Sequence, residues 1–211
     1  MIRCKVTLAG VVNKTAATRE GKDGKPFVSF GVKLPLGDRN GNVMDFEVSV
    51  SADTDKIPEG AVSIGKRVEV LGTMYFRKSG DAVFLNLYAD SVVADTTGID
   101  KIEGEMEFKG RTGKKDIQVL TDKRGKKFQT FSAYSKENSG DEAVFTWVHF
   151  LNFNPDKAGW LKAQQSIQVS GSLDLKIYNG KIHIGCNVKQ IEEWPFDDKK
   201  AQEEQTVRCH G

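Results

Sequence analysis

The stretch Gly24-Lys25-Pro26-Phe27-Val28-Ser29-Phe30 returns about 100 positions later as Gly125-Lys126-Lys127-Phe128-Gln129-Thr130-Phe131. Two further pairs of segments repeat in the same order and at nearly the same offset. They are Val68–Thr73 with Ile167–Ser172, and the turn Ser79-Gly80 with Asn179-Gly180. Ordered matches at one offset indicate the duplication of a single structural unit, and we place the join near residues 95–98.

The repeated unit reads as a set of short β-strands. Apolar and polar residues alternate with a period of two along five segments before Asp95, and polar, glycine-containing turns separate them. The five segments are Arg3–Gly10, Phe27–Val32, Phe46–Val50, Arg67–Gly72 and Val83–Tyr88. A short helix or coil is expected near Ile57–Ile64, between the third and fourth strands.

Five strands with this spacing favour an OB-fold, a small Greek-key barrel that binds oligonucleotides or oligosaccharides. Gly10 lies inside an alternating run and is placed to bend the first strand, as such a barrel requires. We therefore predict an all-β protein of two tandem OB-fold five-stranded Greek-key barrels. The first domain spans residues 1–96 and the second 99–193, and residues 194–211 form a short acidic tail that we expect to be disordered.

The composition is typical of a soluble globular protein. The chain has 211 residues, 38% of them hydrophobic and 28% charged, with a mean hydropathy of −0.43. No run reaches the ~18 apolar residues that span a bilayer, and the first residues lack a signal-peptide pattern. We therefore expect a cytoplasmic protein with no membrane contact. Three scattered cysteines do not form a disulfide framework, and Cys4 and Cys186 fit small core positions.

The net charge of +2 conceals a basic body and an acidic end. After Ile191, six acidic residues stand against three basic ones, so the rest of the chain is more basic than the total suggests. A moderately basic body is compatible with a polyanionic partner.

The repeated motifs resemble those of the bacterial-type single-stranded DNA-binding protein family, in a form with tandem OB-folds. In that family a strand ending in glycine is followed by a Gly-Lys motif that closes on phenylalanine. Gly10 leads to such a motif at Gly24–Phe30, and Gly125–Phe131 repeats it. The family's Thr-x-Trp-His segment resembles Phe145–Phe153, and its Tyr-Leu-x-Lys motif resembles Trp160–Lys162.

The resemblance implies sequence-tolerant binding of single-stranded DNA, which protects the strand in replication, recombination or repair. It also implies a homodimer, because tandem-OB relatives pair two chains so that four barrels serve one strand. Replication proteins are implied as further partners. The implied location is the cytoplasm, at the nucleoid, or the host cytoplasm if a phage encodes the protein.

The chain also departs from the family pattern. The first-repeat positions that match the aromatic positions of the second repeat are not aromatic; they are Glu47 or Val48, Asp53 and Ser79. The second repeat carries a longer insert at residues 108–115. Trp194–Asp198 reverses the order of the family's acidic end and its terminal Pro-Phe, and the chain continues to Gly211. Such divergence would suit a phage or mobile-element protein.

Aromatic residues are the candidates for stacking on unpaired bases, which contributes ~1–3 kcal/mol per base. Alternation places Trp147 on one strand face with Phe145 and His149, while Phe150 faces the core. The other candidates are Phe153 and Tyr178 in the second repeat, and Tyr75 and Phe46 in the first. For adjacent Tyr75 and Phe76 we expect the tyrosine to be the exposed member. The alternative is that Trp147 and Phe153 are core residues.

Basic residues are the candidates for phosphate contacts, and most of them gather before and within the second repeat's Gly-Lys motif. This set is Lys109, Arg111, Lys114, Lys115, Lys123, Arg124, Lys126 and Lys127, with Lys25 and Arg77 in the first repeat. The segment corresponds to a loop through which OB-folds touch their ligands. The alternative is a solvated loop that only adds solubility.

No motif supports catalysis. The chain lacks a phosphate-binding Gly-rich loop, a nucleophile elbow and a Cys-x-x-Cys pair, and its three histidines are scattered. We expect no enzyme activity, no cofactor and no metal. Two other binding functions remain open: an RNA-binding OB protein, and an OB scaffold whose aromatics form protein contacts.

Overall fold

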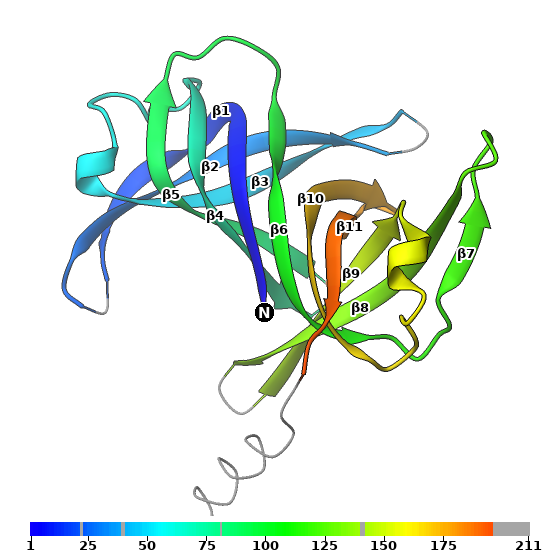
Figure 1. The fold of residues 1–211 in the computed structure, drawn as a ribbon. Coiled ribbons are helices and arrows are strands. Elements are labelled where there is room, and N and C mark those ends of the chain that lie inside the picture. The colour runs from blue at the N-terminus through cyan, green and yellow to red at the C-terminus, as the bar shows by residue number, and fades with distance from the viewer. Residues whose placement is uncertain (22, 39–40, 81, 140–141, 196–211) are drawn as a thin grey trace, which may run out of the picture.

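The computed structural model describes residues 1–21, 23–38, 41–80, 82–139 and 142–195, and the fold in these ranges is all-β. The first repeat contains β1 (Ile2–Glu20), β2 (Pro26–Gly37), β3 (Val43–Asp53), β4 (Arg67–Ser79) and β5 (Ala82–Ala94). The second contains β6 (Lys101–Thr112), β7 (Gln118–Thr121), β8 (Lys127–Ser139), β9 (Glu142–Asn152), β10 (Ser166–Tyr178) and β11 (Lys181–Glu193). Figure 1 shows the two barrels side by side.

The duplication read from the sequence is present in the structure. Each repeat places a 3₁₀ turn after its third long strand, Thr54–Lys56 in the first and Pro155–Ala158 in the second. The turns between the last two strands use Gly80 and Gly180, both with positive φ. The predicted pair of tandem OB barrels is confirmed. In the second barrel the counterpart of β1 is interrupted, and its last part forms the separate short strand β7, which pairs with β8 as the end of β1 pairs with β2. The helix or coil expected near 57–64 is coil and turn, and the 3₁₀ turn precedes it.

A bent first strand closes each barrel. β1 pairs with β4 from Cys4 to Val11 and with β2 from Val11 to Glu20, so one strand belongs to both sides of the barrel. A Cβ on Gly10 would lie 2.6 Å from the carbonyl oxygen of Lys33, and a Cβ on Gly110 would lie 2.2 Å from that of Tyr134. Only glycine allows the strands this close, which confirms the predicted role of Gly10.

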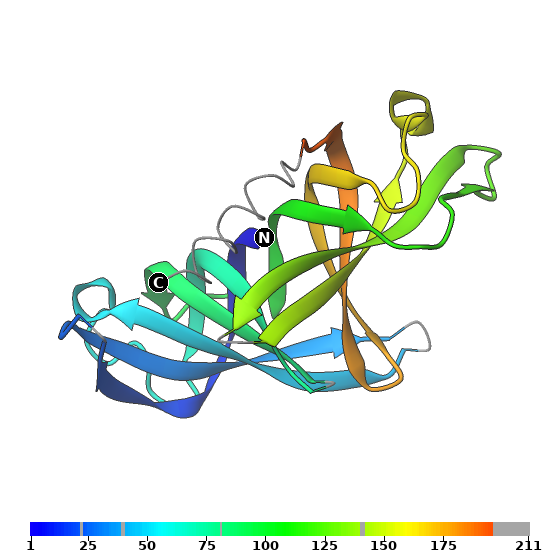
Figure 2. The same cartoon turned by 90° about the horizontal axis from the view of Figure 1, so that it is seen from below.

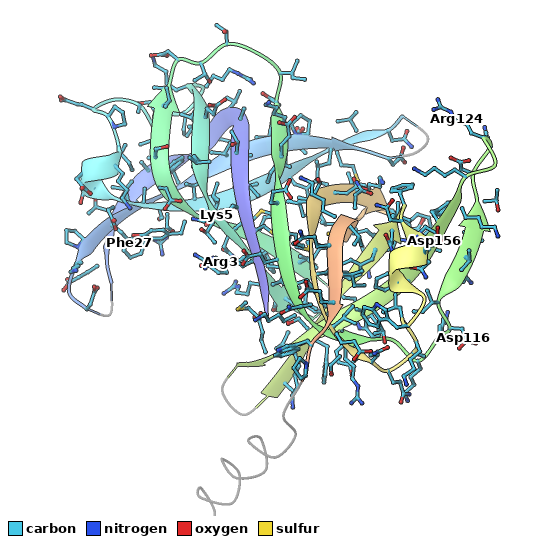
Figure 3. The ribbon with its side chains drawn as sticks, viewed as in Figure 1. Arg3, Lys5, Phe27, Asp116, Arg124 and Asp156 are labelled. Carbon is cyan, nitrogen blue, oxygen red and sulfur yellow. The ribbon has the colours of Figure 1, made fainter. Side chains whose placement is uncertain are left out.

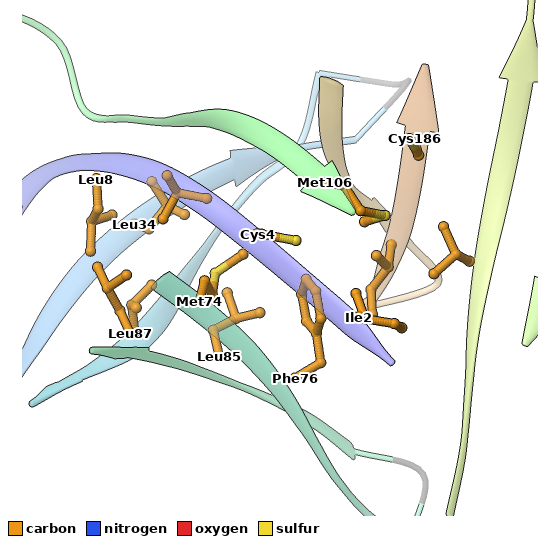
Figure 4. Packing of buried hydrophobic residues seen from close by; sticks show 14 of the residues in the cluster. Ile2, Cys4, Leu8, Leu34, Met74, Phe76, Leu85, Leu87, Met106 and Cys186 are labelled. Carbon is orange, nitrogen blue, oxygen red and sulfur yellow. The ribbon is translucent and has the colours of Figure 1, made fainter. Parts of the chain in front are cut away.

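The two barrels share one sheet and one core. β1 pairs antiparallel with β6 along Ile2–Ala9, which joins all the strands in the order β2-β3-β5-β4-β1-β6-β10-β11-β9-β8-β7. Figures 1 and 2 show this central pair between the barrels. Buried residues of both repeats form a single hydrophobic cluster, and Figure 4 shows Cys4, Met106 and Cys186 within it.

The buried cysteines act as small core residues, as predicted. Burial raises the pKa of the Cys4 thiol and of the Cys186 thiol to about 12, so both stay protonated and unreactive at neutral pH. Cys209 lies outside the described residues. No helix in the described ranges is long and apolar enough to cross a membrane.

Candidate nucleic-acid interface

Strand alternation on β9 exposes a row of aromatic side chains. Trp147 is 50% exposed and Phe145 is 41% exposed, whereas Val148 and Phe150, on the other face of the strand, are buried in the core. The alternative placement of Trp147 in the core is therefore excluded. The burial of Phe150 on the opposite face holds the strand in place, so the indole projects from a rigid base.

Tyr134 on β8 extends this row into a cluster. It pairs across the strands with Trp147, at 5.1 Å between ring centroids and a tilt of 55°. Its ring also meets Phe145 edge-on at 5.5 Å. We call Tyr134, Phe145 and Trp147 the aromatic platform. Contacts within it restrict the rings before any ligand arrives, which lowers the ordering cost of stacking.

A groove of about 820 Å³ lies beside the platform and is lined by Tyr134, Trp147, Arg111, Lys114 and Lys115. The Nε–H of Arg111 donates to the carbonyl oxygen of Gln164 at 2.8 Å, which fixes the guanidinium against the groove wall. Lys114 and Lys115 are exposed on the loop that follows β6. Flat rings and cations therefore border the same hollow.

His149 connects this groove to a second hollow. Its Nε2 lies 2.9 Å from the Thr130 hydroxyl, and the residue lines both spaces. The second hollow, of about 350 Å³, contains Tyr178 and His183, whose rings meet edge-on at 5.5 Å. Its far wall is Gly37 and Asp38, from the first barrel. Tyr178 and the platform thus occupy neighbouring hollows with one shared residue.

Phe153 lies beside the projecting hairpin formed by β7 and β8. Its ring centroid is 5.8 Å from that of Phe128, and 41% of its surface is exposed. Asp122 orders the hairpin turn, because its Oδ1 accepts the backbone N–H groups of Arg124 and Lys126 at 2.9 and 2.8 Å. Figure 3 shows Arg124 at the tip. The turn and the start of β8 carry four further basic candidates, namely Lys123, Arg124, Lys126 and Lys127.

Lys109 is not part of the groove. It lines a separate hollow with Met1, and its Nζ lies 5.8 Å from the ring centroid of Trp194. Trp194 is half-buried, and its backbone N–H donates to the carbonyl oxygen of Ser166 at 3.1 Å. The beginning of the predicted tail is therefore attached to the second barrel. Residues 196–211 lie outside the described residues.

The first-barrel candidates do not form a comparable cluster. Phe46 is half-buried, has exposed neighbours and packs against the core, so its role as a stacking residue stays a prediction. Tyr75 is 48% exposed and Phe76 is buried, which agrees with the predicted orientation of that pair. Arg77 lies over the ring of Phe84 at 5.3 Å, on the opposite barrel from the platform. Lys25 lies in the turn before β2.

Sequence reasoning missed Tyr134, Phe128 and Gly113. Tyr134 stands three positions after Phe131, which is a core residue, so an odd spacing along a strand could have placed it on the outer face. Gly113, which lies under the indole of Trp147, gave no local signal. The described residues contain no group of three or more His, Cys, Asp or Glu side chains that could hold a metal ion.

Among solved structures, the chain is similar to the wild-type single-stranded DNA binding protein from Thermus aquaticus. The two are 13% identical, with a TM-score of 0.50, and 93% of this chain and 94% of that chain are covered. A deletion mutant of the same protein matches at 14% identity and a TM-score of 0.49, over 93% of this chain and 96% of that one. A small single-stranded DNA-binding protein from Streptomyces coelicolor matches 47% of this chain at 21% identity, with a TM-score of 0.34 and 96% of its own chain covered.

No protein-family model matches the chain, and no curated protein sequence does. The match to the Thermus aquaticus protein extends over both barrels, because it covers nearly the whole of each chain. The chain therefore has the fold of that single-stranded DNA-binding protein, and the resemblance read from the motifs is confirmed at the level of the fold.

Proposed function

We propose that the protein binds single-stranded DNA without strong sequence preference, through the second barrel. The observation that carries this proposal is the aromatic platform beside Arg111, Lys114 and Lys115. Unpaired bases offer flat faces to Trp147 and Tyr134, while phosphates meet the cations. Every base has such a face, so stacking tolerates any sequence. A duplex conceals its base faces and should bind much more weakly.

The role that follows is protection of single strands during replication, recombination or repair, without catalysis. RNA remains the second nucleic-acid candidate, because stacking rings and cations can accept a single strand of either kind. Titration of the intrinsic tryptophan fluorescence with oligo-dT, a matched RNA and a duplex of equal length separates the candidates. We expect oligo-dT to quench most and at the lowest concentration. Equal affinity for duplex and single strand would contradict the proposal.

We also propose that two chains form a homodimer through the outer face of the central sheet. On that face Arg3 and Lys5 of β1 stand beside Glu107 and Glu105 of β6, and Figure 3 shows both basic residues on β1. A two-fold axis would bring the basic row of one copy against the acidic row of the other. Exposed apolar residues continue the face on β4 and β5: Leu71, Tyr75 and Phe84.

Light scattering at micromolar concentration tests this assembly. The intact protein should have twice the mass of the chain, and Tyr75→Lys should shift it toward the monomer. A monomeric wild-type protein would refute the dimer and leave the nucleic-acid proposal intact. We propose that each chain consists of two domains, residues 1–96 and residues 99–193. We also propose that the protein is located in the cytoplasm.

A further inference from the structure

The first barrel has a face that corresponds strand for strand to the aromatic platform. On β8 and β9 Tyr134 pairs with Trp147, and on β2 and β3 the equivalent pair is Lys33 with Glu47. Two residues earlier on the third long strand, Asp45 replaces Phe145. The first barrel thus carries charge at all three platform positions.

These charges are paired with one another. Lys33 Nζ lies 2.9 Å from Asp45 Oδ2, and Lys14 Nζ lies 3.1 Å from Glu47 Oε1. The other carboxylate oxygen of Glu47 accepts the side-chain N–H of Asn13 at 3.2 Å. Asn13 occupies the place of Gly113, the residue that makes room for the indole in the second barrel. The contact between Gly113 and Trp147 in the second barrel is therefore replaced, at both positions, by the hydrogen bond between Asn13 and Glu47 in the first.

Stability does not account for this arrangement. The side chains of both ion pairs are between 39% and 69% exposed, and exposed pairs contribute ~0–1 kcal/mol. Their effect on a polyanion is larger. Lys14 and Lys33 are already neutralised by neighbouring carboxylates, and Asp45 and Glu47 would face the phosphates of any strand laid along this surface. No ring at these positions offers a base a stacking surface.

We propose that Asp45 and Glu47 keep nucleic acid off the first barrel, so that a strand engages only the second barrel of each chain. The inference rests on the proposed function and specifies which half of the duplicated surface performs it. The two carboxylates are negative determinants of binding: they hold Lys14 and Lys33 away from phosphate.

The test is the double variant D45N/E47Q, which keeps the size of both side chains and one acceptor oxygen on each, and removes their charge. Releasing two lysines should add about two phosphate contacts. The salt dependence of oligo-dT binding should then steepen by up to ~1.4 in log–log slope, at ~0.7 per contact, with affinity at least about tenfold tighter in 50 mM salt.

The matched control is D90N/D95N. Asp90 and Asp95 are also paired with lysines, at 3.0 Å to Lys5 and 2.7 Å to Lys66, and removing them changes the net charge equally. Neither lies on the platform-equivalent face, so the control should keep the wild-type slope. Thermal melting of both variants checks that the fold is unchanged.

The outcomes separate this inference from the proposed function. If the wild-type protein binds and D45N/E47Q behaves like the control, only the inference is wrong. The variant K14A/K33A tests the inference independently. If its salt dependence of oligo-dT binding is less steep than that of the wild-type protein, Lys14 and Lys33 already contact DNA and the inference is wrong. If neither the wild-type protein nor D45N/E47Q binds oligo-dT, both the inference and the proposed function are wrong.

Discussion

The indole of Trp147 rests on Gly113: a Cβ placed at Gly113 would lie 3.3 Å from Cζ3 and 3.5 Å from Cη2 of the ring. The backbone N–H of Gly113 donates to the carbonyl oxygen of Ser132 at 2.9 Å, so the glycine cannot move away easily. Because Gly113 has no side chain, the indole of the half-exposed Trp147 lies directly against the backbone at this position.

Gly113→Val should weaken binding of oligo-dT. A branched side chain would occupy the space under the indole and tilt Trp147 away from the base it stacks on. The loss should approach, without exceeding, the ~1–3 kcal/mol expected for one stacked base, and fluorescence titration measures it. Gly113→Ala is the graded control, because the exposed ring can shift by a few tenths of an ångström. Equal affinities for wild type and Gly113→Val would remove the glycine from the site.

Trp147→Ala should lose ~1–3 kcal/mol of binding free energy and leave the melting temperature nearly unchanged, because half of the side chain faces solvent. Tyr134→Ala should show a smaller loss of the same kind. Tyr75→Ala removes an aromatic of similar exposure from the other barrel, on the proposed dimer face, and is compared with wild type by light scattering as well as by titration. If Trp147→Ala unfolds the protein and Tyr75→Ala abolishes binding, the functional face has been assigned to the wrong barrel.

K114A/K115A should flatten the salt dependence of binding by up to ~1.4 in log–log slope, since two phosphate contacts disappear. The affinity should fall for every sequence alike, because these contacts read the backbone. K66A/K101A removes the same charge from lysines that pair with Asp95 and Glu103, away from the groove. A slope that changes equally in both variants would mean that net charge, and not the groove, controls binding.

Local patterns predicted much of this molecule, and the misses have a physical cause. Alternation placed Trp147 and Phe145 outside and Phe150 inside, because successive side chains of a strand point to opposite faces and this pattern is visible in neighbouring residues of the sequence. The pairing of β1 with β6 and the contact of Tyr134 with Trp147 depend on register between distant segments. The partial burial of Phe46 was not predicted, because a partly buried aromatic and an exposed one look alike until the strand's inner face is known.

The N-terminal amine should link stability to pH. It donates to the carbonyl oxygen of Lys109 at 2.8 Å and also contacts the Ser135 hydroxyl, and burial lowers its pKa below the usual 8.0. The unfolded chain therefore binds the proton more strongly, so folding stability should decrease as pH falls below 8 and level off beneath the folded-state pKa. Comparing melting curves of the free and N-acetylated protein at pH 6.5 and 8.5 isolates the contribution of the amine to the pH dependence of stability. An identical pH dependence in both forms would contradict it.

The chain after β11 begins with a residue that packs on the second barrel and continues with acidic residues. Trp194 is bound to the second barrel through Ser166 and through the cation of Lys109, whereas Asp197 and Asp198 bring negative charge that could compete with DNA for the cationic groove. Two truncations separate these effects. A chain ending at Pro195 keeps Trp194 and loses the charged end, and a chain ending at Glu193 loses both.

We expect the chain ending at Glu193 to melt at a lower temperature than the chain ending at Pro195, with similar affinity for oligo-dT, because it loses the contacts of Trp194 with Ser166 and Lys109. The full-length protein should melt like the chain ending at Pro195. If the Pro195 truncation instead binds oligo-dT more tightly than the full-length protein at unchanged melting temperature, the acidic end competes for the groove. If both truncations melt like the full-length protein, Trp194 does not act as a structural cap.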